Sequence, residues 1–497
     1  MNYVIGVDLG TSAVKALLVS REEGAVTAEA SREYPLYHDY AGWSEQEPED
    51  WVQATLEAVR EVAAEAGNPS EIKGLSFSGQ MHGLVLLNKD KQPLRRAILW
   101  NDTRTTKQCR RIEEMVGEER LLSITKNPAL EGFTLPKLLW VKEEQPELFA
   151  EADSFMLPKD YVRLRLTGDA AMEYSDAAGT LLLDVGRKEW SREICEAVGL
   201  PFSLCPKLLA SHEEAGTLQE DIRNATGLEE IKVFAGGADN ACGAVGTGIL
   251  EEGTVLSSTG TSGVVLAYEK DAEKDFQGKV HYFNHAESDG YYSMGVTLAA
   301  GHSFSWFKNT FAPDKSFEEL VKLAESSPPG AKGLLFTPYI SGERTPHADA
   351  DVRGSFIGMH ASHTLGDFVR AVMEGITFSL QESLSAFKAQ GKNVQKVVAT
   401  GGGAKSSFWL QMQADIYNTP VVKLKSEQGP GLGAALLAAY GLGWYASLQE
   451  AAGEFAEEAE RFEPETENVL TYSRLFPLYQ EVYASTSSLS TALKDFR

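Results

Sequence analysis

The chain has 497 residues, of which 46 are basic and 71 acidic, so its formal net charge is −25. A chain this long exceeds a single hydrophobic core, and length alone predicts about three domains. The negative field repels nucleic acids and anionic membranes, and no basic run opposes it, so neither is expected as a partner. The field repels nucleotides as well, so a nucleotide site would need Mg2+ and local hydrogen-bond donors.

Cysteine usage and apolar runs lead to an expectation about location. Cys109, Cys195, Cys205 and Cys242 form no CxxC pair, which argues against a zinc or disulfide framework and fits a reduced cytosol. The N-terminus has no basic region, so no signal peptide is expected. The longest apolar run, 434–446, is broken by two glycines and is too short to cross a membrane. We therefore expect a cytoplasmic protein.

Apolar periodicity predicts alternating strands and helices along the chain, which indicates an α/β protein. The expected strands are 3–7 and 14–19 (a hairpin), 73–78, 84–87, 232–235, 254–256 and 264–267 (a second hairpin), and 396–400. The expected helices are 49–66, 135–141, 160–166, a small-residue helix at 242–246, 364–391 with a capping box at Thr364 and Asp367, 406–418, and a final segment. The acidic stretch 456–467 is expected to be a linker.

The two predicted hairpins share the turn Gly-Thr-Ser-x-Val, and their first glycines, Gly10 and Gly260, are 250 residues apart. A glycine lets the backbone approach a ligand closely, and the following hydroxyl and N–H groups can bind an anion. Two such turns on similar halves suggest a phosphate tail held from both sides, an arrangement that resembles the actin, hexokinase and heat-shock ATPases. The competing interpretation is two unrelated turns in a glycine-rich protein.

Charged residues accompany the first of these hairpins. Asp8 is the only acid of the turn, and beside bound phosphate it would hold Mg2+, through water if the ion keeps its hydration shell. Lys15 could neutralise phosphate charge. The alternatives are a turn-forming aspartate and a solvated strand lysine. Because the sequence has no GxxxxGK[ST] or GxGxxG fingerprint, a Walker-type ATPase and a dinucleotide enzyme are not expected.

A second aspartate follows a predicted buried strand in Gly236-Gly237-Ala238-Asp239-Asn240-Ala241. Ligands bind at strand ends in open α/β sheets, and a carboxylate there can accept the proton of an attacking hydroxyl in phosphoryl transfer. The alternative is that Asp239 caps the helix that follows. Its position after two glycines and just before the second hairpin favours catalysis.

Three further segments carry polar groups between apolar runs. Gly401 to Ser406 joins a strand to a helix and suits the adenosine and α-phosphate of a nucleotide, although such turns are common in α/β proteins. Gln80-Met81-His82 and Trp100-Asn101-Asp102-Thr103-Arg104 offer an aromatic face, amides and a carboxylate, which suit a sugar. Alone, His82 would be read as a structural histidine and Trp100 as core packing.

Together these segments resemble the FGGY family of carbohydrate kinases, and the resemblance extends from residue 3 to about residue 437. The matching motifs are DxGTS at 8–12, WSEQEPEDW at 43–51, SGQMHG at 78–83, ILWNDTR at 98–104, GFTLPKLLWVKEEQPE at 132–147, LPKDYVRLRLTG at 157–168, SDAAGTLLLDV at 175–185, GGADNA at 236–241, SGERTPH at 341–347 and GGGAKS at 401–406.

The resemblance implies ATP-dependent phosphorylation of D-xylulose at O5, with ATP and Mg2+ as cofactors. It also implies a two-domain actin-like (ribonuclease H-like) ATPase fold with the active site in the interdomain cleft. We expect residues 1–245 to form the N-terminal domain, with the sugar site, the first phosphate hairpin and the catalytic aspartate. Residues 246–497 would form the C-terminal domain, with the second hairpin and the adenosine loop, and the role of the tail after Ala446 stays open.

The site residues are carried over from the resemblance one by one. It implies Asp239 as the general base and Asp8 as the metal ligand. The expected sugar contacts are Met81, His82, Asn101, Asp102, Asp239 and Asn240. The expected nucleotide and phosphate contacts are Thr11, Ser12, Lys15, Gly260, Thr261, Gly402, Gly403 and Ala404.

Other functions remain open from the sequence. A sister kinase could act on ribulose, gluconate or glycerol, because the residues alone indicate only a polyol-shaped site. A sugar or nucleotide sensor without catalysis would not need both Asp8 and Asp239. A chaperone-type ATPase would lack the sugar-site residues. The oligomeric state is not determined by the sequence, and a homodimer remains an option.

Overall fold

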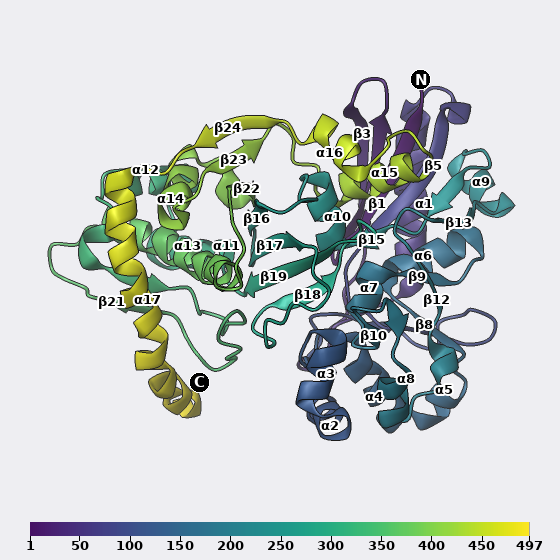
Figure 1. Cartoon of the computed structure of the whole chain (residues 1–497), viewed down its shortest axis with the longest axis horizontal. Coiled ribbons are helices and arrows are strands. Elements are labelled where there is room, and N and C mark those ends of the chain that lie inside the picture. Colours follow the sequence, from purple (N-terminus) through teal and green to yellow (C-terminus); the bar gives the residue numbers. More distant parts are fainter. Residues whose placement is uncertain (497) are drawn as a thin grey trace.

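The computed structural model describes residues 1–496, which form two α/β lobes, each built on a seven-stranded sheet (Figure 1). In spatial order, the sheet of the first lobe contains β13 (Glu214–Thr217), β14 (Lys232–Phe234), β5 (Ile72–Gly79), β1 (Tyr3–Leu9), β2 (Ala13–Ser20) and β3 (Ala25–Glu33), with β15 (Gly237–Ala238) paired to β5. The sheet of the second lobe contains β18 (His281–Asn284), β19 (Tyr291–Thr297), β17 (Gly263–Glu269), β16 (Thr254–Thr259), β22 (Lys396–Gly401), β23 (Val421–Leu424) and β24 (Glu458–Phe462).

The two sheets repeat one topology. In each, a central strand forms an antiparallel hairpin with the next strand, β1 with β2 and β16 with β17. On its other side the same central strand pairs in parallel with a strand that comes later in the chain, β5 or β22. A further parallel strand and an antiparallel edge strand complete that side in both sheets. The repeated Gly-Thr-Ser turns therefore occupy equivalent positions in the two lobes.

Helices and short strands surround the two sheets. The helices are α1 (Pro48–Glu65), α2 (Thr106–Val116), α3 (Glu118–Thr125), α4 (Thr134–Glu144), α5 (Pro146–Ala150), α6 (Pro158–Thr167), α7 (Tyr174–Ala178), α8 (Arg192–Ala197), α9 (Glu220–Thr226), α10 (Asp239–Gly246), α11 (Gly301–Phe311), α12 (Phe317–Glu325), α13 (Leu365–Ala389), α14 (Ser407–Tyr417), α15 (Gly429–Gly441), α16 (Leu448–Phe455) and α17 (Thr466–Ala492). The short strands are β4 (Glu45–Gln46), β6 (Val85–Leu87), β7 (Ala97–Ile98), β8 (Ser154–Met156), β9 (Ala171–Glu173), β10 (Leu183–Asp184), β11 (Glu189–Trp190), β12 (Lys207–Leu209), β20 (Leu335–Thr337) and β21 (Ser355–Ile357).

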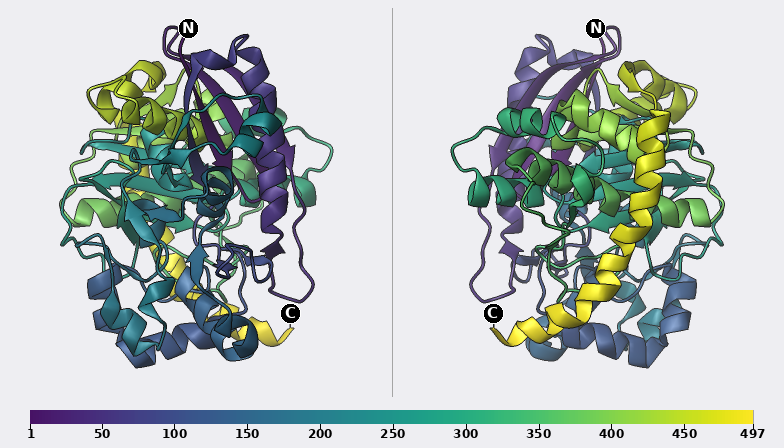
Figure 2. Two further views of the ribbon diagram at one scale, coloured as in Figure 1. Left: turned by 90° about the vertical axis from the view of Figure 1, so that its right-hand side faces the viewer. Right: turned by 90° about the vertical axis from the view of Figure 1, so that its left-hand side faces the viewer.

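Single 3-10 turns lie at η1 (Pro69–Glu71), η2 (Phe202–Leu204), η3 (Ala331–Gly333), η4 (Gly402–Lys405) and η5 (Leu493–Phe496). None of the helices in residues 1–496 is both long enough and apolar enough to cross a membrane. The last long helix, α17, runs along the outer side of the second lobe, where Figure 2 shows it in yellow.

The strands of the first lobe divide their side chains between two cores. In β1, Ile5 and Val7 belong to the core that α1 covers, whereas Val4 belongs to the larger core that continues into the second lobe. In β2, Leu18 joins the first core and Leu17 the second. This split follows from the two-residue period of a strand, and it explains why both hairpin strands are apolar at consecutive positions.

One helix of the C-terminal half crosses to the first lobe. α15 packs against β1, β5 and α10, and Figure 1 shows it above the strands of the first sheet. The approach is so close that glycines are required on both sides. A Cβ added to Gly6 would lie 2.0 Å from the carbonyl oxygen of Gly431, and one added to Gly433 would lie 1.8 Å from that of Cys242. The backbone of α15 therefore rests directly on β1 and α10.

The expected elements are confirmed with small shifts in their ends, and the α/β prediction is confirmed. The capping box at the start of α13 is present, because the Asp367 carboxylate accepts from the Thr364 N–H at 2.8 Å. The linker prediction for 456–467 is wrong, since residues 458–462 form β24 at the edge of the second sheet. An edge strand pairs on one side only and can be charged throughout, so it lacks the apolar alternation that identifies buried strands.

Gly433→Ala tests the contact between α15 and α10. The added methyl group would overlap the Cys242 carbonyl oxygen, so we expect a loss of about 1–3 kcal/mol in the free energy of unfolding. Gly453→Ala in α16 is the matched control, because nothing lies within 4 Å of its added Cβ and the helix should gain about 0.5–1 kcal/mol. Denaturant unfolding of both variants measures the difference, and equal stability would contradict the close packing.

Candidate active site

Buried amides hold the first Gly-Thr-Ser turn in place. The Gln80 backbone N–H donates to the carbonyl oxygen of Leu9 at 2.8 Å, and its side-chain amide reaches the carbonyl of Gly10 at 3.4 Å. The Gln46 amide donates to the carbonyl of Thr11 at 2.8 Å. Sequence reasoning did not select Gln46 or Gln80 as site residues, although both lie in motifs that it recognised. Because these amides bind the turn's carbonyl groups, and the Gly10 N–H donates to the Ala13 carbonyl at 3.0 Å, the N–H groups of Thr11 and Ser12 are the donors that could face a ligand.

The side chains of the other predicted residues in this hairpin differ in whether they already have a hydrogen-bond or ion-pair partner in the protein. The Thr11 hydroxyl accepts a hydrogen bond from the Trp100 indole N–H at 3.0 Å, so this indole supports the turn. Ser12 is exposed. The Lys15 ammonium is 2.8 Å from the Glu29 carboxylate and 3.4 Å from the Gln428 amide oxygen, which connects the hairpin to the start of α15.

Asp8 and Asp239 lie close enough to influence each other. Asp8 is the second-last residue of β1, and Asp239 is the first residue of α10, directly after β15. Burial raises the pKa of Asp8 to about 6. Burial and the charge of Asp8 together raise the pKa of Asp239 to about 7. Two carboxyl groups that disfavour each other's ionisation create a site for a cation or for a proton in transit.

The structure does not support the alternative that Asp239 is a helix cap. The residue at the N-cap position of α10 is Ala238, and the Asp239 carboxylate accepts from the N–H of the next residue, Asn240, at 2.6 Å. The Asn240 side-chain amide donates to the same oxygen at 2.8 Å. The second carboxylate oxygen of Asp239 is therefore left for a ligand.

His82 occupies a strained backbone conformation between Met81 and Gly83. Its φ is +67°, a left-handed value that non-glycine residues rarely adopt. Its ring Nδ1 lies 2.6 Å from the carbonyl oxygen of Gly179. A carbonyl oxygen only accepts, so Nδ1 carries the proton and Nε2 is a free acceptor. Burial lowers the pKa of His82 to about 3, so the ring is neutral at physiological pH.

Several neighbours fix His82 in this position. Its carbonyl oxygen accepts from the Thr134 hydroxyl at 3.0 Å and from the buried Lys137 ammonium at 3.4 Å. A Cβ on Gly179 would lie 2.8 Å from the His82 Nδ1, so a glycine is needed there. These contacts come from the GFTLPK and SDAAG motifs, which sequence reasoning recognised without assigning them a role.

Met81 connects the sugar-side residues with the second lobe. Its sulfur lies 3.7 Å from the Asn240 amide and 3.8 Å from the Tyr292 hydroxyl of β19. The ring of His82 lies 4.6 Å from that of Phe133 and 6.0 Å from that of Phe283 in β18. The structure thus brings Met81, His82 and Asn240 together at the boundary between the lobes.

Asn101 and Asp102 do not lie with Met81, His82 and Asn240 at the boundary between the lobes. Asn101 is exposed and lines a separate surface hollow of about 460 Å3 with His38 and Tyr40. The Asp102 carboxylate is buried and already occupied, since it accepts from the Ser44 N–H at 2.6 Å and from the Arg104 guanidinium at 2.6 and 2.9 Å. A single sequence shows that a carboxylate is present but not that an arginine two residues later binds it.

The second lobe contains a cavity of about 960 Å3 at its Gly-Thr-Ser turn. Four of the expected nucleotide contacts, Gly260, Thr261, Gly402 and Gly403, line this cavity. Ala404 is buried and is not among the lining residues. The remaining wall is partly aromatic, with Phe304, Phe317 and Trp409. Volume and lining both suit a purine base and a sugar–phosphate tail.

A smaller cavity of about 310 Å3 connects the two lobes. From the first lobe it is lined by Asp239 and Asn240, and from the second by residues such as Ser258 and Thr400 at the ends of β16 and β22. Gly401 lines this cavity, and the next residue, Gly402, lines the larger one. A chain of phosphates could therefore reach from the larger cavity to Asp239.

A buried cluster of charges lies under the first lobe's ligand-binding residues. The Lys159 ammonium contacts the carboxylates of Asp160 at 2.8 Å, Glu173 at 3.2 Å and Asp176 at 2.8 Å, and all four side chains are fully buried. A Cβ on Gly79, the last residue of β5, would lie 2.8 Å from the Cβ of Lys159. The strand that leads to Gln80 and His82 therefore rests on the lysine.

The same cluster reaches the residue before Asp239. The Glu173 carboxylate accepts from the Ser175 hydroxyl at 2.7 Å, and the Ser175 oxygen accepts from the Ala238 N–H at 2.9 Å. The backbone at the start of α10 is thereby fixed by a hydrogen-bonded chain that ends on a buried ion pair. This support fixes the position of Asp239, the next residue.

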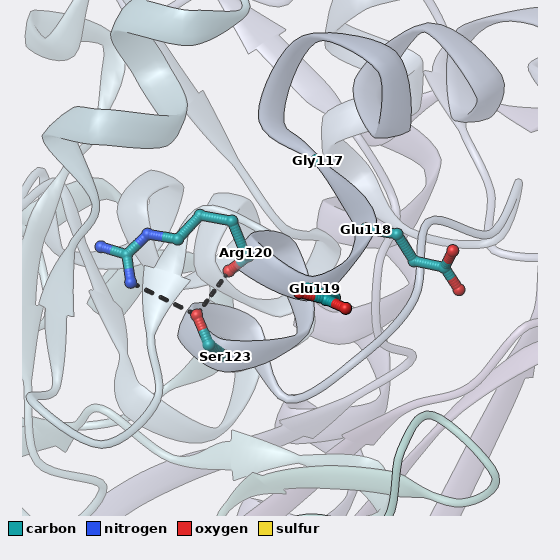
Figure 3. A pocket seen from close by; sticks show the side chains of 5 residues that line it. All are labelled: Gly117, Glu118, Glu119, Arg120 and Ser123. Carbon is teal, nitrogen blue, oxygen red and sulfur yellow. Dashed lines mark hydrogen bonds between the residues drawn. The ribbon is translucent and has the colours of Figure 1, made fainter.

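Another hollow, at the beginning of α3, contains none of the expected site residues (Figure 3). It is lined by Gly117, Glu118, Glu119, Arg120 and Ser123. The Arg120 guanidinium is paired with Glu193 at 2.5 Å, and the Ser123 hydroxyl donates to the Arg120 carbonyl at 2.8 Å. The polar groups drawn toward one another in Figure 3 are thus bound within the protein.

Family comparisons now bear on this geometry. Residues 3–246 match the N-terminal domain of the FGGY family of carbohydrate kinases, and residues 255–442 match the C-terminal domain of the same family. The chain belongs to the FGGY family of carbohydrate kinases. The sequence resemblance is confirmed, and with it the prediction of a carbohydrate kinase with the two-domain actin-like fold.

Individual relatives cover the whole chain. A xylulose kinase of Bacillus subtilis (strain 168) is 59% identical over 499 residues, which span 100% of both chains. The crystal structure of ligand-bound xylulose kinase from Lactobacillus acidophilus has a TM-score of 0.94 at 29% identity and covers 98% of this chain and 99% of that one. A gluconate kinase from the same organism also has a TM-score of 0.94, at 28% identity, with 100% of both chains covered. The fold alone therefore does not distinguish between sugars.

Asp239→Asn should stabilise this kinase in a pH-dependent way. The folded-state pKa of about 7 lies above the usual 3.8, so the folded protein binds more protons and loses stability as pH rises through this window. The amide never ionises, so we expect the variant to gain about 1–3 kcal/mol at pH 8, and less at pH 5. Thermal unfolding without ligands measures this. An equal gain at both pH values would contradict the charge effect.

Proposed function

We propose that this carbohydrate kinase transfers the γ-phosphoryl group of ATP to O5 of D-xylulose and forms D-xylulose 5-phosphate. One observation carries the proposal: Asp239 faces the cavity that links the nucleotide side to the sugar side, next to Asn240 and Met81. The 59% identical relative, which is named a xylulose kinase over its full length, supports this choice of sugar.

In the proposed reaction, Asp239 is the general base. The free oxygen of its carboxylate accepts the proton of the O5 hydroxyl while O5 attacks the γ-phosphorus. The bond from the γ-phosphorus to the bridging oxygen breaks, and ADP leaves. A pKa of about 7 suits this role, because about half of the molecules carry the ionised carboxylate at neutral pH and that carboxylate is basic enough to take up the proton. The hydrogen bonds from Asn240 fix its orientation.

His82 and Met81 bind the sugar in this proposal. The neutral His82 ring presents Nε2 as an acceptor, so it receives a hydrogen bond from a sugar hydroxyl. Met81 contributes a polarisable apolar surface beside Asn240. Asn101 and Asp102 would require a change of surroundings before they could reach the same sugar, because one is exposed elsewhere and the other is bound to Arg104.

ATP would extend from the larger cavity of the second lobe to the first hairpin. Gly260, Thr261, Gly402 and Gly403 would contact the nucleotide, and Thr11, Ser12 and Lys15 would approach its terminal phosphates. Within residues 1–496, no group of three or more metal-ligating side chains could hold a cation by itself. Asp8 and Asp239 nevertheless fit Mg2+, which usually binds one or two carboxylates and completes its shell with phosphate oxygens and water. When bound, Mg2+ would neutralise phosphate charge during the transfer.

In this proposal the binding and catalytic residues are divided between the two halves of the chain. Residues 1–245 would supply the sugar contacts, the first hairpin and the base, and residues 246–497 would supply the second hairpin and the nucleotide cavity. Because neither half completes the site, sugar binding would draw the lobes together before transfer and keep water from competing with the sugar.

The test is a panel of ketoses, sugar acids and polyols with ATP, in which NMR locates the new phosphate ester. D-xylulose phosphorylated at O5 with the highest kcat/KM supports the proposal. A higher kcat/KM for ribulose, gluconate or glycerol would assign the same site to a sister reaction. No turnover with any sugar, together with sugar-dependent thermal stabilisation, would indicate a sensor instead.

Asp239→Asn should keep sugar and nucleotide binding but lower turnover. A general base typically contributes ~10²–10⁴-fold, or about 3–5 kcal/mol of the barrier. Steady-state kinetics gives kcat, and isothermal titration gives both affinities. Asp314→Asn, at an exposed position of the second lobe, is the matched control and should behave like the natural protein. If the Asp239 variant retains more than roughly a tenth of kcat, another group is the base.

His82→Ala should weaken D-xylulose binding by about 5–150-fold with little effect on ATP, because one buried partner of the sugar hydroxyls is lost. The comparison of KM for the two substrates measures this. His360→Ala, on an exposed segment of the second lobe, is the control. Equal losses for both substrates would mean that the substitution disturbs the fold rather than the sugar site.

A further inference from the structure

The SGERTPH motif at 341–347 has no role in the reaction described so far. It lies in the second lobe, in the segment between β20 and β21. Its central residue, Arg344, is partly buried, and burial lowers the pKa of its guanidinium. Taking a cation out of water is costly unless a partner compensates it. The groups around Arg344 therefore indicate which kind of ligand its guanidinium would bind.

The backbone of this motif is fixed to the second sheet. The Thr345 N–H donates to the carbonyl oxygen of Val296 in β19 at 2.9 Å, and the Val296 N–H donates to the Thr345 hydroxyl at 3.0 Å. The Arg344 N–H donates to the Glu343 carboxylate at 2.7 Å. Arg344 thus extends from a backbone segment that is fixed to β19, the strand that also carries Tyr292.

Within residues 1–496, no carboxylate lies within ion-pair distance of the guanidinium and no acceptor takes a hydrogen bond from it. The charges of Glu343 and Glu131 act on it only from farther away. The neighbouring Glu343 carboxylate is already saturated by the Thr297 hydroxyl at 2.5 Å, the Leu298 N–H at 3.0 Å and the Arg344 backbone N–H. Buried arginines elsewhere in the chain are paired, such as Arg104 with Asp102 and Arg370 with Glu374.

The charge of Arg344 acts on the sugar side of the site. After burial, it is among the causes that lower the pKa of His82 and of His281. These two rings belong to one aromatic cluster, because both lie within 6.0 Å of Phe133 and of Phe283. The groups that shift the pKa of Asp239 are instead Asp8 and Asn240. Geometry agrees, because Thr345 bonds Val296 and His281 pairs with Met294 on the same strand, β19, so the motif lies beside this aromatic cluster.

We propose that Arg344 is a sugar-specificity residue that reaches from the second lobe and donates hydrogen bonds to the ketone oxygen of the bound ketose. This rests on the proposed function, in which O5 faces Asp239, so the ketone at C2, three carbons away along the sugar, lies farther from Asp239. A ketone oxygen accepts and cannot donate, so it does not satisfy the neutral Nε2 of His82, whereas a guanidinium matches it. In this proposal Arg344 donates to the ketone oxygen of the substrate, and His82 accepts a hydrogen bond from one of its hydroxyl groups.

The experiment compares Arg344→Met, Arg344→Lys and the control Arg353→Met with D-xylulose and with its carbonyl-free analogue xylitol. Arg353 lies in the same segment, and its guanidinium bonds only the carbonyl oxygens of Ala350 and Val352. For Arg344→Met we expect KM for D-xylulose to rise ~10–100-fold, the dissociation constant of xylitol to change less, and KM for ATP to stay constant. Arg344→Lys should recover part of the loss, and Arg353→Met should show none.

Thermal unfolding separates a ligand-binding role from a structural one. Removing a partly buried cation that makes no direct ion pair should leave the melting temperature of Arg344→Met unchanged or raise it, whereas loss of a structural arginine would lower it. An unchanged KM for D-xylulose would overturn the proposal, and so would a lower melting temperature with a parallel rise in KM for ATP. If the natural protein does not phosphorylate D-xylulose at all, the proposed function fails first, and that result is visible before any variant is made.

Discussion

The buried ammonium of Lys159 is the interaction on which the ligand-binding part of the first lobe depends. Three carboxylates surround it, so it can be buried as a charge, and each of them belongs to a segment that supports the site. Through Gly79 it positions the strand that leads to Gln80 and His82, and through Glu173 and Ser175 it positions the start of α10. Breaking such a cluster by removing one partner typically costs about 3–5 kcal/mol, because the remaining charges are left uncompensated.

The candidate site above this cluster consists of pairs of structural features, and each pair has one member in each lobe. The two Gly-Thr-Ser turns occupy equivalent positions in two sheets of the same topology. Met81 of the first lobe meets Tyr292 of the second, and Asp239 shares a cavity with Thr400. The duplication thus explains why Asp239, the proposed base, and the proposed nucleotide cavity come from different lobes.

Much of this could be predicted from the sequence, because the signals are local. A glycine turn between apolar strands identifies each hairpin, and Asp8 and Asp239 stand out as carboxylates at strand ends. What could not be predicted depends on contacts distant in sequence. The pairing of Asp102 with Ser44, the packing of α15 on β1, and the charged edge strand β24 leave no periodic pattern in the chain. That the Arg344 guanidinium makes no ion pair or hydrogen bond within residues 1–496 is likewise visible only when all its neighbours there are known.

The crossing of α15 to the first lobe has a mechanical consequence. Within residues 1–496 the chain passes between the lobes three times: from α10 to β16, from β23 to α15, and from α16 to β24. Three chain connections between two lobes leave few independent motions. The lobes can open and close about a hinge, but they cannot rotate freely or separate. A fragment cut after Val245 would also expose the face of β1 and β5 that α15 covers, including Gly6 and Gly74. Neither half of this chain is therefore a module that could be exchanged or expressed by itself.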